Sequence, residues 1–174
     1  DFNAGQPDMK EWTDSDRRGN WLDLGGVRIY GAGWFGASTA KRLELLKPHM
    51  VRNGFTILML HAGVTGMAEE FGMIGPDQLA VIRDSVDYVA LGHMHKKYVI
   101  GDYAYNPGAL ENWDIAEARY GDEKGYWLVE VTGRRFRATH HPVRRRHVHL
   151  ATQSCAGATT VQAILEGIGV AAKS

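Results

Sequence analysis

Two short apolar runs, separated by a segment with helical features, constrain the fold of this chain most strongly. Residues Phe55–Leu60 are continuously apolar and Val86–Leu91 are nearly so, which is typical of strands covered on both faces. Between them, Pro76 and Asp77 suit the first turn of a helix, where a backbone N–H is not needed and negative charge is favourable. Strand, helix and strand in this order predict a βαβ unit with parallel strands.

The rest of the chain is expected to add hairpins and two helices to this unit. Short strand-like runs flank glycine-containing pairs, which predict tight turns because glycine accepts a positive φ. The expected elements are a loop over 1–20, a hairpin over 20–30 that turns at Gly25-Gly26, a helix that Ser38 caps and Pro48 ends, hairpins over 98–105 and 125–139, and a short helix over 159–168.

Length and composition indicate a globular chain. A length of 174 residues suits one domain, or one domain with an appendage. With 44% hydrophobic and 23% charged residues, collagen-like, low-complexity and wholly disordered classes are excluded. The lone Cys155 excludes a disulfide framework and a cysteine-rich zinc site, and it predicts a reducing, cytoplasmic location. The apolar stretch Thr56–Ala68 is too short to cross a membrane, so we expect no membrane association.

The net charge of zero conceals a strongly basic segment. Residues Arg134–His149 contain six arginines and four histidines and no acidic residue. Clustered arginines can contact DNA phosphates, and we expect Arg144, Arg145 and Arg146 to bind substrate in this way. The alternative is a solvated hairpin face and a linker that leads to a cap domain.

Three histidines follow the two predicted strands. His61 comes directly after the first strand, and His93 and His95 come after the second. Ligands gather at the carboxyl ends of parallel strands, so three imidazoles at one edge predict a metal site. Imidazole without thiolate suits zinc, iron, manganese or nickel. A histidine at a strand end can also be a hydrogen-bonded structural residue, and no carboxylate ends a third buried strand, so a two-metal site is incomplete here.

Three motifs carry a resemblance to a known family. They are Ile-Leu-Met-Leu-His-Ala-Gly at 57–63, Asp-Tyr-Val-Ala-Leu-Gly-His-Met-His at 87–95, and Tyr-Asn-Pro-Gly-Ala-Leu-Glu-Asn-Trp at 105–113. In order and spacing the region Gly26–His149 resembles the calcineurin-like metallophosphoesterases, and within them the SbcD-type double-strand-break-repair nucleases. The block around His93 and His95, together with the block at 105–113, is the specific part of the match.

The resemblance implies a fold, a reaction and a set of partners. The fold is an α/β four-layer αββα sandwich with mixed sheets. The reaction is hydrolysis of DNA phosphodiesters by a water that two divalent ions, usually manganese, activate between them. By matching position, His61, His93 and His95 are metal ligands. The implied partners are DNA, a second copy of the protein and an SbcC-type ATPase subunit.

The sequence also departs from the family pattern. In the family the Asp-x-His, Gly-Asp and Gly-Asn-His-Asp elements lie upstream of the matched region, and none of them occurs there in this chain. We therefore expect the N-terminal half of the catalytic domain to be absent and the chain alone to be inactive. Residues 1–149 are then the C-terminal portion of that domain, and 150–174 begin a cap or partner-binding region. Ala109 stands where the family commonly has serine.

Several points stay open at this stage. The chain can belong to a phosphoesterase for small phosphodiesters or phosphoproteins, or it can be a non-catalytic half-domain that complements another chain. Asp87 and Glu111 are candidates to orient the histidines, by sequence proximity alone. The glycine-rich segment 31–38 lacks the lysine and the spacing of a phosphate-binding loop, so we expect a turn that can line the site.

Overall fold

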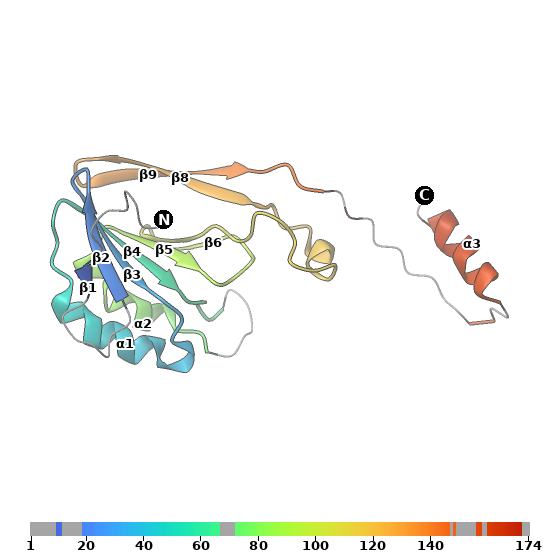
Figure 1. Ribbon diagram of the computed structural model, residues 1–174, viewed down its shortest axis with the longest axis horizontal. Coiled ribbons are helices and arrows are strands. Elements are labelled where there is room, and N and C mark those ends of the chain that lie inside the picture. Colours follow the sequence, from blue (N-terminus) through green and yellow to red (C-terminus); the bar gives the residue numbers. More distant parts are fainter. Residues whose placement is uncertain are drawn as a thin grey trace, which may run out of the picture.

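A mixed seven-stranded sheet forms the centre of the computed structural model, with helices on one face and a long hairpin over the other (Figure 1). The structure describes residues 10–11, 19–66, 72–146, 148, 156–157 and 160–171. The strand order is β1-β2-β3-β4-β5-β7-β6. The strands are β1 (Lys10–Glu11), β2 (Gly19–Leu24), β3 (Val27–Ala32), β4 (Phe55–His61), β5 (Tyr88–Gly92), β6 (Tyr98–Ile100) and β7 (Ala104–Asn106).

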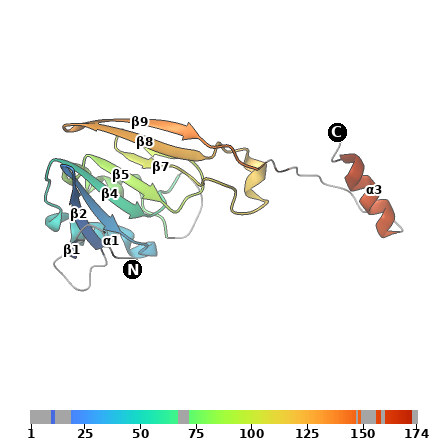
Figure 2. The ribbon, with the colours of Figure 1, turned by 45° about the horizontal axis from the view of Figure 1, so that its top comes forward.

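The helices are short and follow the predicted positions with some differences. The α-helices are α1 (Thr39–Leu46), α2 (Pro76–Ala80) and α3 (Val161–Ala171), and the 3-10 helices are η1 (Gly36–Ser38), η2 (Lys47–His49), η3 (Arg83–Ser85) and η4 (Glu117–Tyr120). Ser38 precedes α1 as predicted, but its side chain makes no capping bond. Instead, the Thr39 hydroxyl donates to the carbonyl of Gly36. In both ribbon views α3 lies away from the sheet (Figure 2).

Parallel pairing of β3, β4 and β5 builds the core on the helical side of the sheet. The register aligns Tyr30 with Leu58, Leu58 with Val89, and Val89 with Ala104, and each of these residues is at most 1% exposed. Leu43 and Leu46 of α1 pack against this row within one buried cluster. The predicted βαβ arrangement with parallel strands is therefore confirmed.

The opposite face of the same strands is more open than the sequence predicted. Side chains alternate across a strand, so the row between the buried rows contains Gly31, Met59, Ala90 and Tyr105. Met59 is 54% exposed although it lies in a continuously apolar run. The prediction that the first apolar run is covered on both faces was wrong at this position, because hydrophobicity alone does not show which layers are present.

The hairpin of β8 (Gly125–Thr132) and β9 (Arg135–Pro142) covers part of this open face. Its Phe136 ring packs against the rings of Phe55, Tyr88 and Tyr105 at centroid distances of 5.9, 5.2 and 5.8 Å. The indole N–H of Trp127 donates to the carbonyl of Asn106. Phe136 and Trp127 of the hairpin therefore pack onto the sheet.

The three predicted hairpins are confirmed, and Gly25 and Gly26 both have positive φ at the first turn. The prediction of loop over 1–20 was wrong at Lys10–Glu11 and Gly19-Asn20, which are strand; residues 1–9 and 12–18 lie outside the described residues.

The mixed α/β class is confirmed, whereas the four-layer sandwich and the boundary at 149–150 stay predictions. No helix in the described ranges is long and apolar enough to cross a membrane.

Candidate functional site

Two of the three predicted metal ligands lie together at the carboxyl edge of the parallel strands. His61 is the last residue of β4 and is paired in register with Gly92, the last residue of β5. His93 follows directly, and the centroids of the two imidazole rings lie 5.2 Å apart. His93 has a φ of 99°, a region that residues with side chains rarely adopt. This backbone conformation therefore costs conformational free energy, which the surrounding structure must offset.

The indole of Trp34 forms a wall beside this histidine pair. Its ring centroid lies 4.2 Å from that of His93 and 5.9 Å from that of His61, perpendicular to the latter ring. Trp34 follows β3 in the segment 31–38. The expected turn is wrong at Gly31-Ala32, which end β3, and at Gly36–Ser38, which form η1, but the part between them lies beside the histidine pair. A tryptophan in a glycine-rich turn has no sequence spacing that marks it, and the sequence did not single it out.

Burial and a neighbouring imidazole both affect the charge of His61. Partial burial lowers the pKa of His61, and a positive charge on His93 lowers it further. The lowered pKa favours the uncharged form of the His61 ring. Neutral imidazole keeps the lone pair that a divalent metal ion requires.

His95 has a different set of neighbours, in the loop between β5 and β6. Its Nδ1 lies 2.5 Å from Oε1 of Glu117. Oε2 of Glu117 accepts hydrogen bonds from the backbone N–H of Trp113 at 3.0 Å and from Nζ of Lys124 at 3.1 Å. The Lys124 side chain is only 2% exposed, so Glu117 provides the partner that a buried ammonium needs.

The charge of Glu117 fixes which nitrogen of His95 carries the proton. Partial burial raises the pKa of Glu117, but hydrogen bonds from His95, from the Trp113 N–H and from Lys124 outweigh it and lower that pKa to about 2. A carboxylate only accepts, so Nδ1–H of His95 donates to it, and Nε2 is the ring nitrogen left for another partner. Carboxylate, histidine and ligand in this order is a common way to orient a metal-binding imidazole.

Sequence proximity selected the wrong carboxylate for this role at His95. Asp87 instead accepts bonds from the guanidinium groups of Arg52 and Arg134 and from the N–H of Thr56, at the amino end of β5. Glu111 accepts from its neighbour Asn112 and from Arg146. Asp114, three residues before Glu117, caps the N–H of Glu117 at 2.9 Å. That Asp-x-x-Glu spacing is a helix-start signal that could have drawn attention to Glu117.

Of the three histidines predicted to bind a metal ion, two lie together and the third has other neighbours. Among residues 10–11, 19–66, 72–146, 148, 156–157 and 160–171, no three His, Cys, Asp or Glu side chains gather as a group that could hold a metal ion. His61 and His93 are close enough to share one ion, whereas His95 is oriented by Glu117. Metal binding by all three stays a prediction.

The basic segment after β9 runs beside the loop that carries Glu111 and Asn112. Nη1 of Arg145 donates to Oδ1 of Asn112 at 2.8 Å, and the backbone N–H of Arg146 donates to Oε2 of Glu111 at 3.3 Å. Arg144 is exposed, and its side chain makes no described hydrogen bond or ion pair within the part of the chain the structure covers. This position leaves the arginines beside the loop of Trp113.

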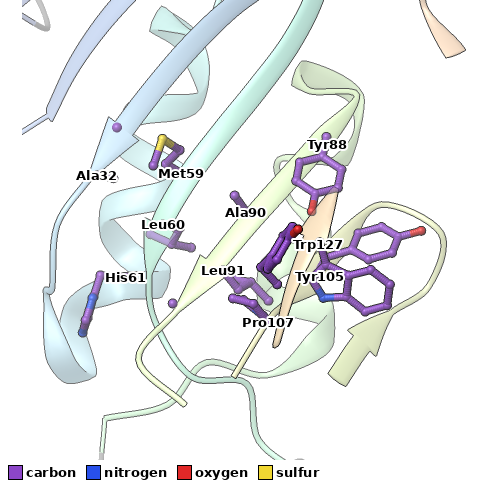
Figure 3. Close-up of a pocket in the computed structure, with 13 residues that line it drawn as sticks. Ala32, Met59, Leu60, His61, Tyr88, Ala90, Leu91, Tyr105, Pro107 and Trp127 are labelled. Carbon is purple, nitrogen blue, oxygen red and sulfur yellow. The ribbon is translucent and has the colours of Figure 1, made fainter. Parts of the chain in front are cut away.

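A cavity of about 540 Å³ opens between the sheet and the hairpin. Figure 3 shows Met59 and Ala90 on the sheet, Tyr105 of β7 next to Trp127 of the hairpin, and His61 at one end. Apolar and aromatic side chains therefore lead to the histidine pair along the open face of the sheet. The cavity holds few polar groups apart from His61 and the tyrosines.

Comparisons with known proteins give little further information. No family model matches the sequence, and no curated protein matches it. Among solved structures, that of a candidate 5'-nucleotidase from Staphylococcus aureus in complex with alpha-ketoglutarate is similar, with a TM-score of 0.39 and 16% sequence identity. The similarity covers 60% of this chain and 27% of that chain, so this chain matches about a quarter of that structure's length.

Proposed function

We propose that this chain is part of a metal-dependent phosphoesterase-type hydrolase that cleaves DNA phosphodiesters. The observation that carries the proposal is the pair His61 and His93, delivered by adjacent parallel strands with ring centroids 5.2 Å apart. The motifs around these residues resemble SbcD-type nucleases, which supports the finer assignment. Two divalent ions, manganese by that resemblance, a homodimer and an SbcC-type ATPase subunit belong to the same proposal.

The donor chemistry of the site fits a divalent ion. His61 and His93 would hold it through neutral imidazole nitrogens, and His95 would add Nε2 while Glu117 fixes Nδ1. A bound divalent ion supplies Lewis acidity and lowers the pKa of water, which phosphodiester hydrolysis requires. Trp34 packs beside the pair, with its ring centroid 4.2 Å from that of His93. Donors beyond these histidines must complete a two-metal site.

Binding of Mn²⁺ tests the metal part of the proposal. We expect the chain to bind Mn²⁺ in titrations followed by electron paramagnetic resonance, because His61 and His93 are preplaced. His61→Ala and His93→Ala should each weaken binding at least about tenfold. His49→Ala, which removes an exposed histidine in η2, is the matched control and should leave binding unchanged. Equal Mn²⁺ affinity in all four proteins would refute the site.

Binding of nucleic acid tests the substrate part. A filter assay with duplex and single-stranded DNA should show that affinity falls as the salt concentration rises. In a plot of log affinity against log salt concentration, each contacted phosphate contributes roughly −0.7 to −0.9 to the slope. Arg144→Gln and Arg146→Gln should reduce that slope. Binding of Mn²⁺ without any salt-dependent DNA binding would favour a phosphoesterase for small substrates or phosphoproteins.

A second candidate is a non-catalytic half-domain that complements another chain. The open face of the sheet favours it, because Met59 is 54% exposed beside Gly31 and Ala90 in a row that a further layer could cover. Under this alternative Met59→Lys leaves the fold of this chain intact but prevents it from complementing its partner. Under the hydrolase proposal the histidine substitutions are the ones that abolish function.

A further inference from the structure

Three large apolar side chains stand out from the loop between β7 and β8. Leu110, Trp113 and Ile115 are 60%, 81% and 69% exposed. Exposed apolar residues scattered singly need no explanation, but these three lie within six positions of one loop. Trp113 is the most exposed of them, and an indole offers a planar face for stacking.

Hydrogen bonds hold the backbone of Trp113 in place. Its N–H donates to Oε2 of Glu117 at 3.0 Å, while Asp114 accepts from the N–H of Glu117 at 2.9 Å. Glu117 is itself fixed by buried Lys124 and by Nδ1 of His95. The centroid of the Trp113 ring lies 6.0 Å from that of His95. One carboxylate therefore positions both the exposed indole and a predicted metal ligand.

Arginines lie beside this loop, which also carries the exposed carboxylate of Asp114 next to Trp113. Arg145 is bonded to Asn112, the residue before Trp113, and Arg146 to Glu111. The nearby carboxylates Glu111 and Glu117 are neutralised by these and other described partners, while Arg144 remains exposed without a described partner in the part of the chain the structure covers. An anionic ligand with a flat aromatic part suits both features of the surface.

We propose that Trp113 is a stacking platform for a nucleobase of an unpaired DNA strand whose phosphates meet Arg144 and Arg146. The inference rests on the proposed function, because it names the part of the substrate that lies next to His95. Stacking on an aromatic side chain accepts any base, and clustered arginines accept any backbone. The platform therefore places a strand end by its shape and charge and not by its sequence. The hydrogen bond that holds Trp113 in place uses its backbone N–H, so the indole ring remains exposed for stacking on a base.

The experiment measures the affinity of the 174-residue chain for fluorescein-labelled oligo(dT) by anisotropy, in EDTA so that no hydrolysis occurs. We expect Trp113→Ala to weaken binding about fivefold to a hundredfold. Trp113→Phe keeps an aromatic face and should retain most of the affinity. Leu24→Ala removes an exposed apolar side chain at the β2–β3 turn and is the matched control, with unchanged affinity.

The salt dependence separates stacking from a general loss of structure. Trp113→Ala should lower affinity at every salt concentration and leave the log–log slope unchanged, whereas Arg144→Gln with Arg146→Gln should reduce the slope. Thermal unfolding of each variant controls for folding. Folded Trp113→Ala that binds oligo(dT) as tightly as the parent would overturn the platform, as would Trp113→Phe that binds as weakly as Trp113→Ala.

Competition with thymidine monophosphate identifies the source of the base. If the mononucleotide displaces oligo(dT) from the parent but not from Trp113→Ala, the platform takes free nucleotides; if only oligonucleotides compete, it takes a strand. The EDTA condition also keeps the two proposals distinguishable. A parent chain that binds no Mn²⁺, or histidine variants that bind it as tightly as the parent, would refute the hydrolase without affecting this measurement. A Trp113→Ala variant without effect would refute the platform alone.

Discussion

Replacing Glu117 by glutamine should destabilise this chain markedly, because one carboxylate serves three donors. Glu117 accepts from Nδ1 of His95, from the N–H of Trp113 and from Nζ of Lys124. Glutamine has nearly the same shape but no charge and only one acceptor oxygen. The variant therefore removes the negative charge that pairs with the Lys124 ammonium, a side chain that is only 2% exposed.

The structure gives the size of the expected loss. The fall of the Glu117 pKa from 4.5 to about 2 corresponds to about 3 kcal/mol at 1.36 kcal/mol per pKa unit. The Glu117 side chain is 19% exposed, and solvent screening reduces this figure to about 2 kcal/mol. The unpaired charge of Lys124 makes the loss of stability larger, since removal of one partner from a buried pair costs about 3–5 kcal/mol. We therefore expect the free energy of unfolding to fall by about 2–4 kcal/mol.

Urea denaturation followed by far-ultraviolet circular dichroism measures this change. The matched control is Glu123→Gln, because Glu123 also pairs with a lysine, Lys97, but is 53% exposed. Its variant should lose far less stability than Glu117→Gln. Glu117→Gln combined with Lys124→Met should recover part of the loss, because no buried ammonium remains.

Equal midpoints for Glu117→Gln and the parent protein would refute the reasoning. The same conclusion would follow if Lys124→Met failed to recover any stability in the double variant, because the loss would then have another origin. A loss equal to that of Glu123→Gln would show that Glu117 behaves as an ordinary surface carboxylate.

Two further predictions concern Glu117 and His93. The lowered pKa of Glu117 means that its stabilisation is complete above about pH 4.5 and is lost as the pH falls towards about 2, so Glu117→Gln should flatten this part of an acid-unfolding profile. His93→Ala should be less stable than His93→Gly by about 1–2 kcal/mol in urea denaturation, because both remove the imidazole but only glycine accepts a φ of 99° without strain. Equal stability of the two His93 variants would show that the conformation carries no strain.

The strands and the placement of His61 and His93 could be predicted because their signals are local. The apolar run at 55–60 and the histidines at its end and after β5 are visible in the sequence, and parallel pairing then brings them together. Two glycines with positive φ mark the first hairpin equally locally. Signals of this kind depend on neighbouring residues alone, so the sequence is enough to predict the local structure.

Partners that are distant along the chain could not be predicted. Glu117 lies 22 residues after His95, and proximity favoured Asp87 and Glu111 instead. Asp87 belongs to the opposite end of β5, where Arg52 and the hairpin residue Arg134 bind it. Sequence distance does not indicate which end of a strand a side chain serves, and only the register and the loop path determine it.

The loop from Gly92 to His95 is arranged for the position of its imidazoles more than for stability. His93 occupies a φ of 99° directly after a glycine, although a glycine at 93 would relieve that strain. His95 engages a carboxylate that also neutralises Lys124, so its orientation depends on a buried charge that costs free energy to desolvate. A loop selected for stability alone would have a glycine at 93 and no buried ammonium beneath it. A strained backbone at His93 and a buried charge beside His95 thus accompany two imidazoles that face different neighbours from one short loop.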